Sequence, residues 1–454
     1  MTTAARRRQM VLLAVVTVLG LTVWFSATAV SPALQAEWGI SPVTAVWITA
    51  SVQLGFVTGG VTSALLTLGD RFRPQLVMAI AAAGASLSTA LLALTANGFW
   101  AAVVLRFLTG VFLAGLYPVG MKVMASWAAP RQRGKAFGLL LGALTVGSGM
   151  PHLISGLADL PWRQVMLVAA AVTAVAGIIA VLWVRPGPHA HQQPSRPRIR
   201  HAWAGFRTRT PLLANLGYFG HMWELYAFWT WLPTFLLLSR QTQFGGQGVE
   251  WIGLVVFLAI GVAGLAGCLL GGWAADRFGR RLAAVSALLV SGACCLLSPV
   301  MFRAAWPVMI VFLVLWGASV IADSGVFSTS LSESVDPRYV GTALTAQTAL
   351  GFLLTVVTIQ LVPVLASALG WQFAFLLLLP GPVAGAAAMY LQHRPSHQPD
   401  TTAGTAEPTA PFARLSAGEQ VDGQHPGQSP SKGARTGSPG SSRGAKPEHG
   451  IVST

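Results

Sequence analysis

The chain has 454 residues, of which 54% are hydrophobic and only 9% charged, and its mean hydropathy is +0.62. Soluble domains carry about 25% charged residues to cover a water-facing surface, so the composition excludes a soluble globular protein. The formal net charge of +15 would suggest nucleic acid as a partner of a soluble protein. Here the basic residues are spread over loops between apolar runs, which excludes a nucleic-acid-binding module and indicates a polytopic membrane protein.

The N-terminal segment combines a basic start with a long apolar run. Arg6, Arg7 and Arg8 precede an apolar stretch from Met10 to Val30. At 1.5 Å per residue this stretch can cross about 30 Å of hydrocarbon, and it is longer than the apolar core of a cleavable signal. We therefore predict a retained first transmembrane helix.

Similar apolar runs recur along the whole chain, separated by proline, glycine or charged residues. Hydropathy over a window of about 19 residues predicts twelve transmembrane helices and an all-α membrane protein. The predicted helices lie at about residues 10–33, 44–68, 76–95, 98–121, 135–158, 162–184, 212–238, 249–274, 282–302, 304–327, 340–366 and 370–391.

The basic residues of the loops indicate the orientation. If residue 1 is cytoplasmic, 19 lysines and arginines fall in cytoplasmic loops, and only Arg163, Arg240 and Arg303 fall outside. Cytoplasmic loops of membrane proteins carry an excess of lysine and arginine. We therefore predict that both termini are cytoplasmic and that the chain is a multi-pass protein of the cytoplasmic (inner) membrane.

Two polar stretches divide the chain into parts. A proline-broken basic segment at 185–211 separates a six-helix half at 1–184 from a second half at 212–392. The tail at 393–454 is rich in Pro, Gly, Ser, Thr and Gln. Such a composition cannot bury enough apolar surface to offset the entropy of ordering, so we predict a cytoplasmic linker and a disordered cytoplasmic tail.

Three loop motifs recur in the second half at an offset of 206 to 209 residues. The repeated pairs are Asp70-Arg71-Phe72 with Asp276-Arg277-Phe278, Pro130-Arg131 with Pro337-Arg338, and Trp162 with Trp371. Each pair occupies the equivalent loop of its half. The sequence therefore indicates two homologous six-helix bundles.

Two motifs resemble those of the major facilitator superfamily of secondary transporters, and the resemblance extends over about residues 8–392. The segment from Gly272 to Arg281, GWAADRFGRR, matches the superfamily's G-x-L-a-D-R-x-G-R-R/K loop with alanine in place of leucine. The segment RFLTG at 106–110 is similar to the Arg-x-x-x-Gly signature of its fourth span. The resemblance implies two pseudo-symmetric six-helix bundles that alternate access to a site between them.

The same resemblance implies a gate on the cytoplasmic side. Its predicted residues are Gly272, Asp276, Arg277, Gly279 and Arg280, with Asp70 and Arg71 as the first-half copy. Gly279 allows a sharp backbone turn, and an aspartate can accept hydrogen bonds from exposed amides at a helix N-terminus. The alternative is that this basic loop only sets the topology.

Four ionisable residues within the predicted helices are candidates for function. His221 and Glu224 lie three residues apart in the seventh helix and share a face, whereas Arg106 and Asp323 lie in the fourth and tenth. A charge at mid-bilayer costs about 2.5–3.5 kcal/mol on insertion scales, so such residues usually face the bundle interior and have a function. We expect Glu224 and His221 to serve proton coupling or substrate binding, with a fixed structural hydrogen bond as the alternative. Asp323 is either a gate or coupling acid or an interfacial group that snorkels to the cytoplasm. For Arg106, the resemblance implies either proton transfer or the anchoring of helices.

Neutral polar and aromatic residues supply further candidates for a substrate cavity. Trp24 lies in the first predicted helix, Gln53 in the second, Trp231 in the seventh and Gln347 in the eleventh. Packing explains each of them equally well. The tryptophans of the seventh helix favour an organic solute over an inorganic ion.

The sequence contains no nucleotide-binding loop, no metal-ligand cluster and no nucleophile triad, so no enzyme activity, cofactor or metal is expected. We predict a monomeric, proton-linked symporter or antiporter of a small solute, with the bilayer, the solute and protons as its partners. A uniporter on the same fold and a transporter-like sensor are the alternatives. A cation, an amphipathic drug-like molecule and a protonated acid all stay open as substrates, as does the direction of transport.

Overall fold

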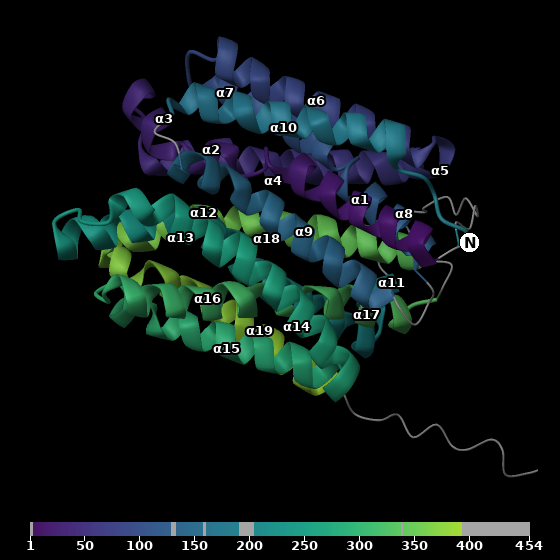
Figure 1. Ribbon diagram of the computed structural model, residues 1–454. Helices are drawn as coiled ribbons and strands as arrows, with labels where there is room; N and C mark the ends of the chain where they lie inside the picture. The colour runs from purple at the N-terminus through teal and green to yellow at the C-terminus, as the bar shows by residue number, and fades with distance from the viewer. Residues whose placement is uncertain (1–2, 129–132, 158–159, 190–203, 337–338, 393–454) are drawn as a thin grey trace, which may run out of the picture. The chain divides into compact units, whose positions relative to one another are not determined.

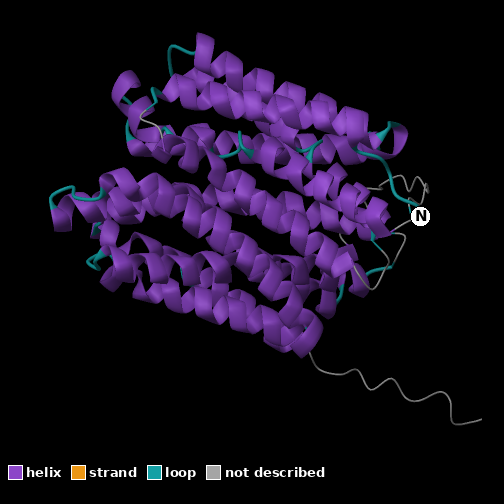
Figure 2. Ribbon diagram, in the orientation of Figure 1, coloured by secondary structure: helices purple, strands orange, loops and turns teal. Residues whose placement is uncertain are grey.

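The computed structural model describes residues 3–128, 133–157, 160–189, 204–336 and 339–392. Within these ranges every regular element is a helix (Figures 1 and 2). The tail predicted at 393–454 and residues 190–203 of the predicted linker lie outside the described residues, as do Pro130-Arg131 and Pro337-Arg338 of the repeated motifs.

The first half contains ten helical segments, several of which are parts of one membrane span. They are α1 (Thr3–Leu21), α2 (Ser26–Ala29), α3 (Ser31–Trp38), α4 (Pro42–Leu65), α5 (Leu68–Arg71), α6 (Pro74–Thr95), α7 (Phe99–Leu113), α8 (Tyr117–Trp127), α9 (Arg133–Leu157) and α10 (Trp162–Trp183).

The second half repeats this order after the short helix α11 (Ala204–Arg207). It contains α12 (Arg209–Phe244), a 3₁₀ turn (Val249–Trp251), α13 (Ile252–Phe257), a π-helical turn (Leu258–Val262), α14 (Ala263–Phe278), α15 (Arg280–Met301), α16 (Trp306–Ala322), α17 (Ser324–Ser334), α18 (Val340–Leu369), a 3₁₀ segment (Trp371–Leu378) and α19 (Pro380–Gln392).

Among the described residues, ten helical stretches are long and apolar enough to cross a membrane. They correspond to ten of the twelve predicted spans. The other two are the first, which is interrupted after 19 residues of α1, and the seventh, in which polar residues such as His221 and Glu224 lower the hydropathy of the long helix α12. The chain is therefore a helical multi-pass membrane protein.

Three spans predicted as continuous helices contain a break. Residues 22–25 form a turn between α1 and α2, residues 114–116 separate α7 from α8, and Asp323 separates α16 from α17. Pro118 accounts for the second break, because the proline ring clashes with a preceding helical turn. Hydropathy is averaged over a window, so these short interruptions leave no trace in it.

The sequence repeat is also present in the packing. A β-carbon at Gly110 would lie 2.1 Å from the carbonyl oxygen of Val52, and one at Gly317 would lie 2.0 Å from that of Ala259. Both residues of the second pair lie 207 positions after those of the first. Because no side chain fits there, glycine allows α7 to contact α4, and α16 to contact the span of α13 and α14, backbone to backbone.

The two halves contact each other through two groups of helices within one compact unit, residues 1–395. α9 packs along α13 and α14, and α4 packs against α18. A β-carbon at Gly142 would lie 2.3 Å from Leu265 Cδ1, and one at Gly156 would lie 2.9 Å from the backbone nitrogen of Leu254. Glycines of α9 thus bring the halves together in the middle of this helix and at its C-terminal end.

Hydrogen bonds join α3 to α10 at one end of the first half. Trp162 Nε1 donates to Glu37 Oε2 at 2.5 Å, and Arg163 Nη2 donates to Glu37 Oε1 at 2.9 Å. Arg163 Nη1 also donates to the carbonyl oxygen of Ala93 at 2.7 Å, and its guanidinium lies 4.4 Å from the centre of the Trp162 ring. The repeated motif that contains Trp162 therefore holds a helix end in place.

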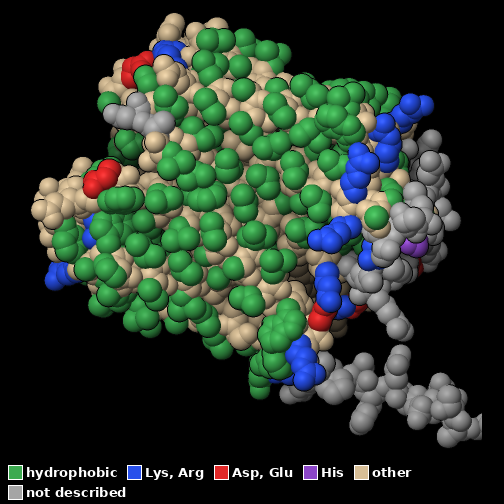
Figure 3. Space-filling model, viewed as in Figure 1, with side chains coloured by type: hydrophobic (Ala, Val, Ile, Leu, Met, Phe, Trp, Pro, Cys, Tyr) green, Lys and Arg blue, Asp and Glu red, His purple; other side chains and the backbone are tan. Residues whose placement is uncertain are grey.

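The surface separates apolar and basic side chains. Apolar side chains cover the flank in Figure 3, and lysine and arginine gather near the end of the helices that carries α5, α11 and α17 (Figure 1). Trp100 is 77% exposed and Leu94 is 66% exposed, as expected for side chains that contact lipid rather than water.

Candidate functional site

The break in the first span is held by Arg106 of α7. Its Nη1 donates to the carbonyl oxygen of Val23 at 2.9 Å and to Ser26 Oγ at 3.2 Å, and its Nη2 donates to the carbonyl oxygen of Trp24. Arg106 is fully buried, and no carboxylate among the described residues pairs with it. The guanidinium thus binds two backbone carbonyl groups at the break in the first span and places a buried positive charge in the first half.

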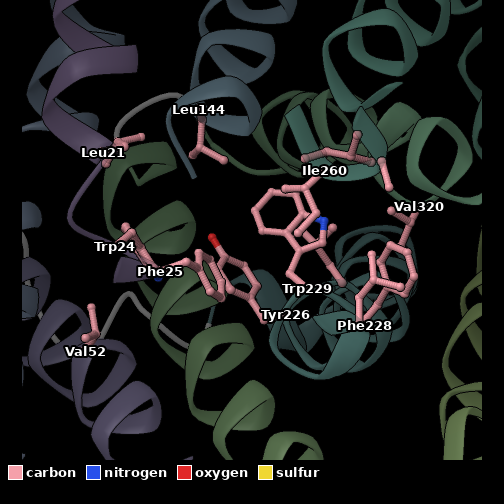
Figure 4. Packing of buried hydrophobic residues seen from close by; sticks show 14 of the residues in the cluster. Leu21, Trp24, Phe25, Val52, Leu144, Tyr226, Phe228, Trp229, Ile260 and Val320 are labelled. Carbon is pink, nitrogen blue, oxygen red and sulfur yellow. The ribbon is translucent and has the colours of Figure 1, made fainter. Parts of the chain in front are cut away.

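Aromatic rings from both halves meet between α4 and α18. We call them the central aromatic cluster, which consists of Trp24, Phe25, Phe56, Tyr226, Trp229 and Phe352. The Trp24 ring centre lies 4.9 Å from that of Phe56 and 5.7 Å from that of Phe352. Tyr226 and Phe352 are 5.0 Å apart. Figure 4 shows Trp24 and Phe25 of the first half facing Tyr226 and Trp229 of α12.

Several buried polar groups lie on the helices that carry this cluster. Gln53 on α4 has no hydrogen-bond partner among the described residues for either Nε2 or Oε1, and the same holds for Nε1 of Trp24 and of Trp229. Gln347 on α18 donates from Nε2 to Asn215 Oδ1 at 2.9 Å, whereas its Oε1 has no partner in the described chain. Buried polar groups normally have partners, so this region has unused hydrogen-bonding capacity.

Glu224 lies inside the second half and is fully buried. Its Oε1 accepts from Ser291 Oγ at 2.5 Å, from Trp316 Nε1 at 2.7 Å and from Cys295 Sγ at 3.3 Å. These donors lie on α15 and α16. All three bonds end on one oxygen, which leaves Oε2 as the oxygen that can take up a proton.

His221 lies next to a second acid, Asp323. His221 Nδ1 lies 2.8 Å from Asp323 Oδ1, although the angle is not that of a hydrogen bond, and its Nε2 lies 2.8 Å from Ser324 Oγ. All but the partly buried Ser324 are inaccessible to solvent. Asp323 is also close enough to Glu224 and to Cys268 of α14 to interact with them electrostatically. The break at Asp323 therefore brings the two acids predicted from different spans together.

α12 thus presents two chemically different groups of side chains. Tyr226 and Trp229 point toward the first half (Figure 4). Glu224 contacts α15 and α16. Phe228 stacks on Trp316 with 4.4 Å between ring centres. One helix therefore links the central aromatic cluster to the buried acids.

A small polar pocket lies between the halves near Trp231. It is lined by Thr28, Ser31, Pro42, Val46, Thr49, Thr230, Trp231 and Thr234, and its volume is about 10 Å³. Thr28 and Thr49 share a hydrogen bond of 2.8 Å between their hydroxyls. Trp231 Nε1 donates to the carbonyl oxygen of Ile359 at 2.8 Å, so this tryptophan joins α12 to α18.

The gate motif lies where α14 ends and α15 begins. Gly279 has φ of +90° and forms the sharp turn between them. A β-carbon at Gly134, in the first turn of α9, would lie 3.9 Å from Asp276 Oδ1. The acid of the second half is thus next to a helix N-terminus of the first half, where the helix dipole favours a negative charge.

The other gate residues contact their own half or solvent. Arg280 forms an ion pair with Glu333 of α17. Arg277 and Arg71 are exposed, and a β-carbon at Gly272 would meet no described atom within 4 Å. The Asp70 side chain lies outside the described residues.

The structure thus divides the sequence-predicted residues between three places. Trp24 is part of the cluster, and Gln53 and Gln347 lie on the helices α4 and α18 that contribute rings to it. Glu224, His221 and Asp323 lie inside the second half, and Asp276 lies at the turn predicted as the gate. Residues that sequence reasoning missed are the donors to Glu224 and the rings of Phe56, Tyr226 and Phe352. The sequence could have pointed to Trp316, because a buried indole N–H in a membrane span needs a hydrogen-bond acceptor.

The comparisons with known proteins agree with this architecture. The sequence profile of the Major Facilitator Superfamily matches residues 12–358 and, in a second match, 237–421. The chain belongs to the major facilitator superfamily. The human organic anion transporter MFSD10 has a similar structure, with a TM-score of 0.64 and 17% sequence identity over 87% of this chain and 100% of that one.

Two curated superfamily members are similar in sequence. The niacin transporter NiaP of Acinetobacter baylyi is 25% identical over 284 residues, which is 55% of this chain and 62% of the relative. The 3-(3-hydroxy-phenyl)propionate transporter of Escherichia coli is 29% identical over 251 residues, or 54% and 59% of the two chains. This superfamily member thus matches about three fifths of the length of these relatives.

Proposed function

We propose that this superfamily member is a proton-coupled transporter of small aromatic carboxylic acids, and that it alternates access between its two halves in the cytoplasmic membrane. The central aromatic cluster is the observation that carries the proposal, because both halves contribute rings to it. A site shared by both halves is the kind that their relative movement can expose to either side in turn.

The substrate class follows from the chemistry of this region. Stacked and edge-to-face ring pairs are worth about 0.5–1.5 kcal/mol beyond the area they bury, so the cluster suits a flat ring. Both curated relatives are named for acids that contain an aromatic ring and a carboxyl group. Of the three substrate classes left open by the sequence, these observations favour the acid.

The distribution of buried charge supports an anionic substrate. Within the described residues, the first half buries the positive charge of Arg106, and the second half buries the acids Glu224 and Asp323 together with Arg240 near the end of α12. Arg106 lies behind the Trp24 backbone, where its positive potential attracts a carboxylate toward the first half. We assign it the further role of fixing the break in the first span.

Glu224, His221 and Asp323 are the groups that we assign to proton coupling. Oε2 of Glu224 accepts the proton. The His221–Asp323 pair then connects Glu224 with the region of Cys268, where α14 faces α9. α12 carries both Glu224 and Tyr226, so movement of this helix links the protonation of the acid to occupation of the cluster.

Proteoliposomes test the coupling. An imposed pH gradient is expected to drive uptake of labelled nicotinate or 3-hydroxyphenylpropionate, and Glu224→Gln is expected to abolish the response to the gradient because the amide cannot release a proton. Glu250→Gln, at an exposed site, is the matched control and should retain the response. Gradient-driven uptake by Glu224→Gln would show that proton coupling lies elsewhere.

The three hydrogen bonds to Glu224 favour one alternative, in which the acid is structural and the chain is a uniporter. Counterflow exchange separates the two functions. A uniporter exchanges labelled acid at the same rate in wild type with and without a pH gradient, whereas the proposed coupled transporter does not.

The orientation and assembly are part of the proposal. The basic end of the helices in Figure 3, which carries α5, α11 and α17, faces the cytoplasm. Two six-helix bundles, with boundaries near 184 and 212, form a monomeric transporter. Asp276 and the N-terminus of α9 then form the cytoplasmic gate.

A further inference from the structure

Gln53 lies between two regions already described. Thr49, Gln53 and Phe56 are spaced four and three residues apart on α4 and so form one stripe along the helix. Thr49 lines the small polar pocket and bonds to Thr28. Phe56 belongs to the central aromatic cluster, with its ring centre 4.7 Å from that of Phe352. The stripe therefore places the Gln53 amide at the edge of the cluster.

The Gln53 side chain is fully buried, and neither end of its amide has a partner among the described residues. Burial of such a group without a hydrogen bond costs free energy that an apolar side chain of the same size would avoid. Nε1 of Trp24, whose ring packs against Phe56, is also buried without a hydrogen-bond partner among the described residues. Beside the rings, Gln53 Nε2 and Trp24 Nε1 are thus donors without an acceptor, and Gln53 Oε1 is an acceptor without a donor, among the described residues.

We propose that Gln53 is a specificity-determining residue that recognises a hydroxyl group on the ring of the transported acid. A hydroxyl matches the available groups because it both donates and accepts. It can donate to Gln53 Oε1 and accept from Gln53 Nε2 or from Trp24 Nε1. This inference rests on the proposed function, since it assumes an aromatic acid in the cluster.

The inference predicts discrimination between acids that differ only in the hydroxyl. An unsubstituted ring leaves the amide buried and unpaired, whereas a ring with a suitably placed hydroxyl satisfies it. Binding of benzoate and of 2-, 3- and 4-hydroxybenzoate to the detergent-purified full chain measures this discrimination. We expect one isomer to bind about 10-fold more tightly than benzoate, because a fixed amide reaches one position of the ring.

Gln53→Met removes the amide and keeps the length of the side chain. This variant is expected to lose about 10-fold in affinity for the preferred isomer and to bind benzoate at least as tightly as wild type. Gln164→Met, at an exposed position of α10, is the matched control and should keep the preference of the wild type.

The outcomes separate this inference from the proposed function. If the variant weakens binding of benzoate and hydroxybenzoates equally, Gln53 only supports packing and the inference is wrong, while the transport of aromatic acids stands. If wild type binds none of the four acids, the proposed substrate class is wrong and the inference with it. The wild-type isomer series decides the matter even if Gln53→Met does not fold, because equal affinities for all four acids contradict a fixed hydroxyl site.

Discussion

At the scale of single residues, Glu37 shows how one side chain secures a helix end. The Trp162 indole and the Arg163 guanidinium both donate to its carboxylate, and together they lower its pKa from the ordinary value, although partial desolvation opposes them. Both donors lie in the first turn of α10, while Glu37 lies in the last turn of α3. The stability that this contact contributes therefore depends on the charge of Glu37.

A pH dependence follows from the lowered pKa. The stabilisation is fully present above the pKa of an unfolded glutamate, about 4.3, and is lost as the pH falls through the lower folded pKa. We expect Glu37→Gln to melt at a lower temperature than wild type at pH 7, and the difference to be smaller at about pH 3. Thermal unfolding in detergent at the two pH values measures this, with Glu250→Gln as the control. A difference that persists unchanged at low pH would show that the carboxylate charge is not involved.

The sequence could predict which ionisable residues lie in the membrane spans, but not which residues contact them. A buried charge is rare in a membrane helix, so Arg106, His221, Glu224 and Asp323 were recognisable from the sequence alone. Their partners were not, because Trp316 lies 92 residues from Glu224 along the chain and no local spacing relates them. The His221–Asp323 contact depends on a helix break that hydropathy does not detect.

At the scale of elements, the π-helical turn in the eighth span forms a contact between the halves. Thr145 Oγ1 of α9 donates to the carbonyl oxygen of Gly142 in its own helix at 2.7 Å and lies 3.2 Å from that of Gly261 in the π turn. π turns inside helices often occur at functional sites. Since Thr145 keeps a partner in its own helix when the halves separate, the contact with Gly261 can break at low cost.

Removal of this hydroxyl tests the contact. We expect Thr145→Val to weaken the contact between α9 and the π turn by about 1 kcal/mol, and therefore to speed amide hydrogen exchange across residues 258–262 by about 5-fold. Exchange followed by mass spectrometry measures the change. Thr242→Val, whose hydroxyl bonds only within α12, is the matched control. Unchanged exchange in the π turn would show that Thr145 does not hold the two halves together.

Helix positions were largely predictable, whereas helix continuity was not. Apolar runs located the spans because each must match the thickness of the bilayer. The turn at residues 22–25 and the π turn both accept hydrogen bonds from other helices, from Arg106 in the first case and from Thr145 in the second. A single sequence does not contain those contacts.

At the scale of the whole molecule, Asp276 is the gate residue that reaches the other half. Its carboxylate lies next to the N-terminus of α9, and such a contact is worth about 0.3–1 kcal/mol at an exposed site. Loss of the charge should therefore shift the population of states open at this end by about 2- to 5-fold. Arg280 and Glu333 pair within one half, so we expect their ion pair to contribute less to this balance.

A native cysteine reports the opening. Cys268 is buried where its backbone oxygen lies 3.4 Å from the position of a β-carbon at Gly138 of the other half. We expect Asp276→Asn to raise the alkylation rate of Cys268 by N-ethylmaleimide about 2- to 5-fold, as measured by mass spectrometry. Cys294, buried within the second half, serves as the internal reference. Equal rates for Cys268 in wild type and variant would show that Asp276 does not hold the gate closed.

The repeat and the superfamily were evident from the sequence, because loop motifs and glycines recur at nearly constant spacing. The arrangement of the halves was not, since it depends on which rings and glycines face each other. Gln53 illustrates the difference: the sequence shows a polar residue in a span, and the structure shows that the residue lacks a partner.

The central aromatic cluster bears on whether protons and small ions leak across the membrane through the empty protein. Rings from both halves occupy the route between them, and the adjoining polar pocket has room for little more than a single water molecule. We expect an empty carrier closed in this way to pass no file of water, and so to conduct neither protons nor small ions. On this expectation, idle copies of the protein leave the electrochemical gradient of the membrane intact, however many of them the membrane contains.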